Sequence, residues 1–244
     1  YWFNINILHT VTMIINKDSL IEGLIIPIFK PLNWTSFDVV KKLRGDFKKR
    51  FNLKKIKVGH AGTLDPLATG LLLICTGRKT KIIEDLQNLD KTYLATFDFG
   101  KTTPSFDRET GCDKNYPTDH ITKELIIKNL KYFQGKIKQK PPIYSALKFK
   151  GKRMYELARK GETIDIQYRE VIIHEFNMLN SNFPEFDFKI KCSKGTYIRS
   201  LANDFGKKLK SGAYLKYLER YSIGEYNINN SLTIDSVSKL ISDQ

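Results

Sequence analysis

The pattern of hydrophobic and polar positions along the chain predicts both strands and helices. Uninterrupted apolar runs are typical of buried strands, and strict alternation of apolar and polar residues is typical of half-buried ones. On these two signals, strands are expected at residues 24–29, 71–75, 92–99, 170–179 and 186–192. The last of these alternates most clearly, with Phe186, Phe188 and Ile190 on one side.

Four other segments repeat their apolar side chains at helical spacing. One helix is expected to begin at Thr35 or Ser36 and to reach Phe47, and a second to begin at Thr122, because hydroxyl side chains cap helix N-termini. Two more are expected at 198–209 and 233–241. Strands joined in hairpins, with helices between the groups, predict an α+β fold with a mixed, largely antiparallel central sheet flanked by helices.

Charge is the feature of the composition that bears most on function. The 244 residues include 41 Lys and Arg against 26 Asp and Glu, a net charge of +15. This excess indicates either a polyanionic partner such as nucleic acid or a general compositional bias toward basic residues. Eighteen basic residues fall in two windows, 41–57 and 136–160, each with one acid and with aromatic residues interspersed. That clustering favours a surface that tracks phosphates over two ordinary solvated helix faces.

Other classes are excluded by what the sequence does not contain. The three cysteines are far apart and form no zinc-ligand spacing, so neither a disulfide scaffold nor a metal site is expected. No apolar run is long enough to span a membrane, and residues 1–12 have no basic signal-peptide region. A cytoplasmic location follows as an expectation, with residues 1–22 as an N-terminal extension and residues 23–244 as one domain.

The segment from Gly59 to Gly70 is the densest candidate for chemistry. Its three glycines and one proline predict a tight loop that holds a single carboxylate, Asp65, just before a buried strand. Pro66 restricts the backbone of Asp65 and so helps to fix its direction. Catalytic groups concentrate on such loops, although an aspartate that merely closes the turn fits the same pattern.

A second segment, Lys191 to Ala202, places Arg199 in the first turn of a predicted helix. A cation there opposes the helix dipole, which favours a carboxylate or phosphate partner, unless the side chain simply faces water.

Four ordered motifs together resemble the TruB family of tRNA pseudouridine synthases, which isomerise a uridine in the T loop. They are Lys30–Ser36, Gly59–Gly70, Pro141–Lys148 and Lys194–Arg199, and the similarity covers residues 23–220. The resemblance implies that residues 140–168 form a thumb-like RNA-binding insertion. In this family Asn33 commonly corresponds to glycine, and asparagine tolerates the left-handed conformation that such a turn requires.

The resemblance also implies roles for individual residues. Asp65 takes the place of the catalytic aspartate, Tyr93 that of a tyrosine stacking on the target base, and Arg199 that of an arginine paired with the aspartate. Without the resemblance, Tyr93 would be interpreted as a core aromatic on an alternating strand. Four further positions match substrate-binding or supporting residues of the pocket: His60, Lys30, Tyr197 and Leu218.

The reaction implied by the resemblance needs no cofactor, because it breaks a glycosidic bond and forms a C–C bond within one substrate. An ionised Asp65 could attack the sugar, attack the base, or remove a sugar proton, and all three routes stay open. The implied partner is the T stem-loop of tRNA, bound by a monomer without protein partners. The family's usual C-terminal PUA domain is not expected in this chain. The alternatives are an RNA-binding or tRNA-folding protein with secondary or lost catalysis, and a guide-RNA-dependent synthase.

Overall fold

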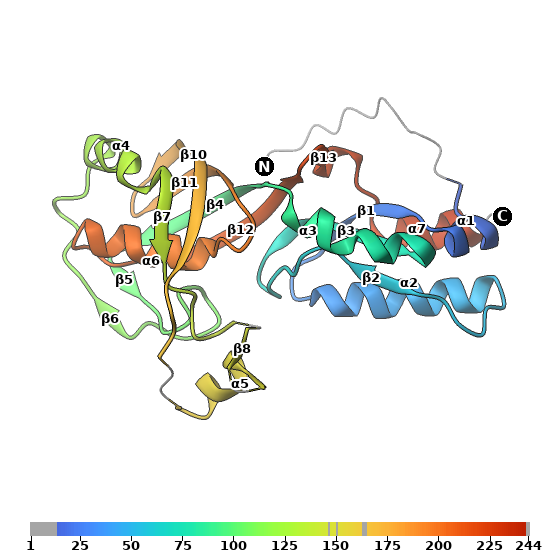
Figure 1. Cartoon of the computed structure of the whole chain (residues 1–244). Helices are drawn as coiled ribbons and strands as arrows, with labels where there is room; N and C mark the ends of the chain where they lie inside the picture. Colours follow the sequence, from blue (N-terminus) through green and yellow to red (C-terminus); the bar gives the residue numbers. More distant parts are fainter. Residues whose placement is uncertain (1–13, 146, 150, 163–164, 243–244) are drawn as a thin grey trace. The chain divides into compact units, whose positions relative to one another are not determined.

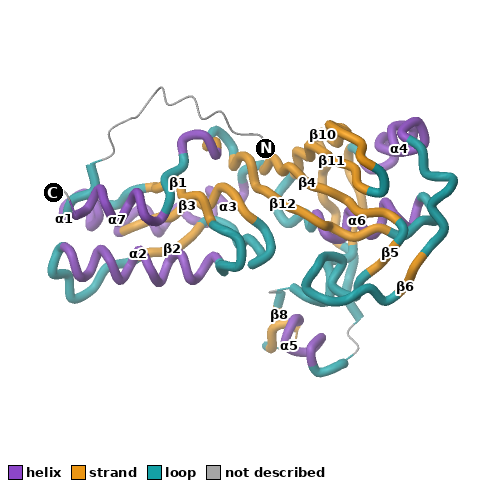
Figure 2. The backbone as a smooth tube through the Cα atoms, turned by 180° about the vertical axis from the view of Figure 1, so that it is seen from behind, coloured by secondary structure: helices purple, strands orange, loops and turns teal. Residues whose placement is uncertain are grey.

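The computed structural model describes residues 14–145, 147–149, 151–162 and 165–242. These residues divide into two units with separate sets of contacts. The first, here the Asp65 unit, comprises residues 14–91 and 219–242, and the second, the Tyr93 unit, comprises the described part of 92–218. Figure 1 labels the elements and Figure 2 distinguishes helices from strands.

The Asp65 unit contains a small sheet with helices on both faces. Its elements are α1 (Lys17–Glu22), β1 (Ile25–Lys30), α2 (Ser36–Arg50), β2 (Val58–His60), β3 (Thr69–Thr76), the 3-10 turn η1 (Gly77–Ile82), α3 (Ile83–Asn88), the second half of β12 (Ala213–Ile223), β13 (Tyr226–Asn227), η3 (Ile228–Asn230) and α7 (Ile234–Ser242). The strand order is β1-β3-β12, with β2 on β3 and β13 on β12. The pairs β1–β3 and β2–β3 are antiparallel, whereas β12 runs parallel to β3.

The side chains of β3, which is fully buried, point alternately into two hydrophobic cores. Leu72 and Ile74 pack with α2 and α7 on one face, whereas Leu71 and Leu73 pack with Leu86 of α3 on the other. The predicted apolar face of α2 is confirmed, because the side chains expected to face inward are all buried: Val39, Val40, Leu43 and Phe47. Ile15 and Leu20, which precede β1, also belong to the first core.

The Tyr93 unit is built on a second stretch of sheet. Its elements are β4 (Lys91–Phe99), β5 (Lys101–Thr102), β6 (Lys114–Asn115), α4 (Lys123–Leu130), η2 (Lys131–Phe133), β7 (Gly135–Gln139), β8 (Lys148–Phe149), β9 (Lys152–Arg153), α5 (Met154–Arg159), β10 (Arg169–Asn182), β11 (Glu185–Cys192), α6 (Ile198–Lys208) and the first half of β12. The strand order is β12-β4-β11-β10-β7, and β10 is antiparallel to both β11 and β7.

Aromatic side chains form the core of the Tyr93 unit. Phe97 and Phe188 lie 4.8 Å apart between ring centroids, and Phe176 lies 5.1 Å from Phe188. Phe205 packs α6 against Phe176 at 5.4 Å. The alternation of β11 is confirmed, with every second side chain buried.

The structure therefore confirms the expected fold class and every predicted helix and strand, with boundaries shifted by one to three residues. Several elements were not predicted, and β12 is the largest. Its sequence does not alternate simply, because Glu219 and Arg220 are buried next to Leu218. Among the described residues, no helix is both long and apolar enough to cross a lipid bilayer.

Candidate functional site

Residues 61–68, here the Asp65 loop, join β2 to β3 in the Asp65 unit. Asp65 is half-buried, and its carbonyl accepts a hydrogen bond from the Ala68 N–H at 3.1 Å, so the chain turns immediately after the carboxylate. The predicted tight loop is confirmed in its conformation, since Gly62 and Gly70 have φ angles of 103° and 106°. The role of Asp65 stays a prediction.

The segment that leads into α2 contacts the backbone on both sides of Asp65. The Ser36 hydroxyl accepts a hydrogen bond from the Leu64 N–H at 2.8 Å and donates one to the Leu64 carbonyl at 3.2 Å. The Asn33 N–H donates to the Pro66 carbonyl at 2.8 Å. Asn33 has a φ of 66°, so the left-handed conformation expected at this position is confirmed.

Arg220 of β12 is 1% exposed and holds the Asp65 loop from another direction. Its Nε donates to the Leu71 carbonyl at 2.8 Å, its Nη2 to the Gly62 carbonyl at 3.0 Å, and its Nη1 to the Thr63 carbonyl at 3.4 Å. Arg220 was not predicted from the sequence. It follows Glu219 directly, and two adjacent charged residues are usually exposed, because charges are seldom buried without partners.

Lys30, predicted as a pocket residue, is fully buried at the end of β1. Its Nζ donates to the carbonyls of Pro31 at 2.9 Å and Trp34 at 2.7 Å. Burial lowers the pKa of this amine to about 8, while the neighbouring Asp65 carboxylate acts in the opposite direction. The structure thus brings the charges of Lys30 and Asp65 close enough to interact.

His60, also predicted, ends β2 next to the Asp65 loop and is half-buried. Burial lowers the pKa of the imidazole, and the nearby Arg220 cation lowers it further. The ring is therefore neutral at pH 7. Its buried Nδ1 has no hydrogen-bond partner among the described residues.

The other predicted residues lie in the Tyr93 unit. Tyr93 on β4 and Leu218 on β12 are nearly buried, at 9% and 8% exposure. Tyr197 precedes α6, and the Gln139 amide fixes its backbone by accepting from its N–H at 2.8 Å and donating to its carbonyl at 3.1 Å. Tyr93 therefore lies on a strand as predicted, and its burial alone agrees equally with a core position.

Arg199 lies in the first turn of α6, as expected, and is buried with a carboxylate partner from its own unit. Its Nε lies 3.5 Å from Asp107 Oδ2, and its Nη1 donates to the Ser105 carbonyl at 3.3 Å. Asp107 was not predicted. A partial signal was present, because Pro104 and Ser105 indicate a turn shortly before this aspartate. Asp65 and Arg199 belong to different units, and their predicted ion pair stays a prediction.

The two basic windows are exposed where the structure describes their side chains. In the window 41–57 every Lys and Arg is exposed except Arg44, which is half-buried and lies 5.9 Å from the centre of the Phe37 ring. Within the segment 140–168, here the insertion, Met154 and Leu157 form a small core of their own. The residues packed around that core are Ile143, Leu147, Phe149 and Ile166.

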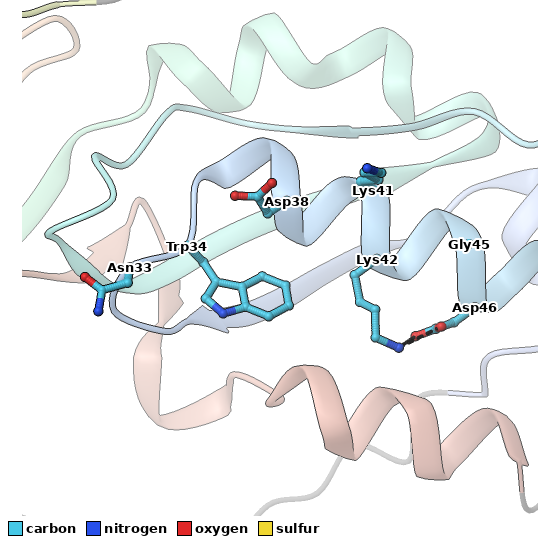
Figure 3. A pocket seen from close by; sticks show the side chains of 7 residues that line it. All are labelled: Asn33, Trp34, Asp38, Lys41, Lys42, Gly45 and Asp46. Carbon is cyan, nitrogen blue, oxygen red and sulfur yellow. Dashed lines mark hydrogen bonds and ion pairs between the residues drawn. The ribbon is translucent and has the colours of Figure 1, made fainter.

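A shallow pocket lies beside α2, next to the turn that contacts the Asp65 loop. Figure 3 shows the Trp34 ring alongside the helix and the Lys42 ammonium directed at Asp46, at 2.7 Å. Its remaining lining residues are Asn33, Asp38, Lys41 and Gly45. The pocket contains equal numbers of acids and lysines, so it has no clear preference for an anion. Within the described residues, no group of His, Cys, Asp and Glu is arranged to hold a metal ion.

Comparison with known proteins defines the class of this chain. A family model described as the N-terminal domain of TruB family pseudouridylate synthases matches residues 48–198. A chain in the crystal structure of a Cbf5–Nop10–Gar1 complex has the same fold, with a TM-score of 0.67 and 26% identity over 91% of this chain. The match covers 55% of that solved chain, so this chain spans about half its length. The class is that of the pseudouridylate synthases, which are isomerases.

Curated relatives narrow the class to one family. The chain is 53% identical over 218 residues to tRNA pseudouridine synthase B of Flavobacterium johnsoniae, and the aligned region covers 89% of this chain and 95% of the relative. It is 49% identical over 223 residues to the protein of the same name from Phocaeicola vulgatus, over 91% of this chain and 95% of the relative. The chain belongs to the TruB family of pseudouridylate synthases.

Proposed function

We propose that this protein isomerises one uridine in the T loop of tRNA to pseudouridine, with Asp65 as the catalytic group. The observation that carries the proposal is the identity of about half of all residues with tRNA pseudouridine synthase B over 95% of the relative's length. An enzyme that shares this much of its sequence over its whole catalytic domain is expected to share its reaction. A cytoplasmic monomer without a cofactor stays a prediction.

The geometry around Asp65 supports a catalytic role for this carboxylate. The flanking peptide groups are hydrogen-bonded to Ser36 and Asn33, and the buried Lys30 ammonium lies close enough to interact electrostatically with Asp65. Preorganised charge near a reacting group lowers the barrier because it does not have to be rearranged during the reaction. A carboxylate that only closed a turn would not require a buried cation beside it.

The chemistry requires an ionised carboxylate in each of the three open routes. Asp65 would attack the ribose or the base as a nucleophile, or would take a proton from the ribose as a base. Cleavage of the N-glycosidic bond then frees the uracil, which turns and bonds through its C5 to C1′ of the ribose. C5 loses its proton, N1 takes one up, and any bond between Asp65 and the substrate is broken, so that the product is an isomer of the substrate. We propose that Arg199 is a second cation for this site, while Asp107 fixes the guanidinium in place.

The target base has to leave the folded T loop before it can react. Flipping a base out of its stack costs a few kcal/mol, and stacking on an aromatic side chain returns about 1–3 kcal/mol. We propose that Tyr93 provides this stacking surface, that Leu218 packs beside the base, and that His60 and Tyr197 support the remodelled loop. The exposed basic windows would bind the phosphates, which makes affinity fall steeply as salt rises.

The direct test is Asp65→Asn with an unmodified tRNA transcript under single-turnover conditions, with pseudouridine mapped by position. The wild type is expected to modify one T-loop uridine, and Asp65→Asn to be slower by roughly a thousandfold or more. Asp235→Asn serves as the matched control, because this exposed aspartate lies on α7 of the same unit.

Binding separates catalysis from an RNA-binding role. Asp65→Asn should keep the affinity of the wild type for tRNA, because phosphate contacts do not involve this carboxylate. Product formation by Asp65→Asn at the wild-type rate would refute the catalytic role. Absence of product with the wild type, together with tight binding, would instead favour an RNA-binding or RNA-folding protein.

A further inference from the structure

The peptide groups on either side of Asp65 are held by one short segment. The Ser36 hydroxyl makes two hydrogen bonds to Leu64, at 2.8 and 3.2 Å, and the Asn33 N–H makes one to Pro66, at 2.8 Å. Both residues immediately next to Asp65 are therefore tied to the segment 33–36. Ser36 is 2% exposed, so water does not compete for these bonds.

Ser36 is not needed to cap the helix that it begins. Thr35 is the N-cap of α2, and its hydroxyl accepts from the Asp38 N–H at 3.0 Å. The Asp38 carboxylate in turn accepts from the Thr35 N–H at 2.9 Å, which completes a capping box. Because this pair satisfies the helix terminus, the only described hydrogen bonds of the Ser36 hydroxyl go to the loop.

Arg220 holds the start of the same loop and the strand that follows the loop. Its guanidinium donates to Gly62 and Thr63 before Asp65 and to Leu71 after it. One planar group thus donates to three carbonyls in a fixed geometry, whereas the three donors of a lysine share one nitrogen and rotate. The backbones of Gly70 and Arg220 also lie close together, since a Cβ on Gly70 would be 2.7 Å from the Arg220 backbone nitrogen.

We propose that Ser36 and Arg220 are positioning residues that set where the Asp65 carboxylate points. The inference rests on the proposed catalytic role of Asp65 and extends it to two side chains that do not touch the substrate. Ser36 fixes the peptide next to Asp65, and Arg220 fixes the start of the loop and the Leu71 carbonyl in the strand that follows. Displacement of a reacting group by about 1 Å can cost about a hundredfold in rate, so the effect appears in turnover and not in binding.

The main test is Ser36→Ala, measured as the single-turnover rate at saturating tRNA, the Kd for tRNA and the Tm. The rate is expected to fall about tenfold to a hundredfold, with Kd within twofold of the wild type. Ser36→Thr keeps the hydroxyl and should restore most of the rate. Thr80→Ala is the matched control, because the Thr80 hydroxyl donates to the Gly77 carbonyl at 2.8 Å in the same unit, away from the loop.

Arg220→Lys is the second variant, with charge retained and the fork lost. It should also slow turnover at unchanged Kd, and its Tm is compared with that of the wild type to establish that it folds. If Arg220→Lys does not fold, Ser36→Ala and Ser36→Thr alone decide the proposal.

The outcomes separate the two proposals. If Asp65→Asn is inactive and Ser36→Ala turns over like the wild type, the positioning role is refuted while the catalytic role of Asp65 stands. If Asp65→Asn is active, the catalytic role itself fails. Positioning is also refuted if the rate of Ser36→Ala falls only in proportion to its loss of folded protein. The same holds if Ser36→Thr does not restore the rate.

Discussion

The Asp65 loop and the insertion are both irregular segments, but they are held in opposite ways. Hydrogen bonds from Asn33, Ser36 and Arg220 fix the loop to elements of its own unit. The insertion has instead a core of two buried side chains, Met154 and Leu157, both on a helix of six residues. Short helices have little stability of their own.

The difference matches what each segment is proposed to do. A carboxylate that reacts must be in place before the substrate arrives, which favours many backbone-directed bonds from a rigid scaffold. A segment that closes over RNA must be able to move without unfolding its unit, which favours a separate small core. Substitutions in the two segments test whether the loop is held rigidly and the insertion is not.

The largest contrast is expected from the same substitution at two glycines. Gly70→Ala should destabilise the protein by about 3 kcal/mol or more, because a Cβ would collide with Arg220 backbone atoms at 2.5–2.7 Å in a left-handed conformation. Gly151→Ala in the insertion meets nothing within 4 Å and should cost only about 1–2 kcal/mol of local strain. Urea unfolding measures both. Equal losses would show that the backbone directly after the loop is no more tightly packed than the insertion.

A leucine truncation in each core should separate stability from binding. Leu43→Ala removes a fully buried side chain beneath α2 and should lower the free energy of unfolding by about 3 kcal/mol. Leu157→Ala should leave the main unfolding transition in place and weaken tRNA binding severalfold, because it loosens only the insertion. Circular dichroism during urea titration and a tRNA binding assay provide the two readouts. A fall in the main transition in Leu157→Ala would mean that the insertion is part of the main core.

Acid should affect the Asp65 unit through His60. The pKa of His60 is lowered in the folded protein. Below pH 6.5 the imidazole therefore binds a proton more readily in the unfolded chain than in the folded one. Stability contributed by neutral His60 is therefore complete above this pH and is lost as the pH falls. His60→Gln should lose less stability than the wild type between pH 7.5 and about pH 5.5. An identical loss in both proteins would contradict the buried, neutral imidazole.

The smallest effect is expected where the insertion forms an ion pair with the rest of its unit. Arg159 lies 2.7 Å from Glu109, but the two side chains are 63% and 34% exposed. Exposed pairs contribute about 0–1 kcal/mol, so Arg159→Ala should leave the Tm nearly unchanged, as should Glu109→Gln. A drop of several degrees in either variant would reveal a fixed insertion.

Local sequence signals predicted the elements with short-range causes. The Thr35 and Thr122 caps, the apolar face of α2 and the alternation of β11 depend on neighbours a few residues apart, and all are confirmed. The left-handed conformation of Asn33 was expected instead from the glycine that commonly takes this position in the TruB family.

Contacts that span the sequence could not be predicted in this way. Arg220 meets its carbonyl partners 149 to 158 residues away, and Arg199 meets Ser105 94 residues away. No local pattern marks such pairs, and the buried charges of β12 concealed its alternation. The family motifs therefore located the candidate residues, while the structure was needed to find Arg220, Ser36 and Asp107 around them.

The long separation between Arg220 and the Asp65 loop has a consequence for folding during translation. The loop leaves the ribosome first, and Arg220 and the rest of β12, which pairs with β3, follow some 150 residues later. A nascent chain can form α2 and the antiparallel β1–β3 pair before then, since domains fold as their segments emerge. The carboxylate of Asp65, which we propose to be catalytic, reaches its final position only after Arg220 has been synthesised.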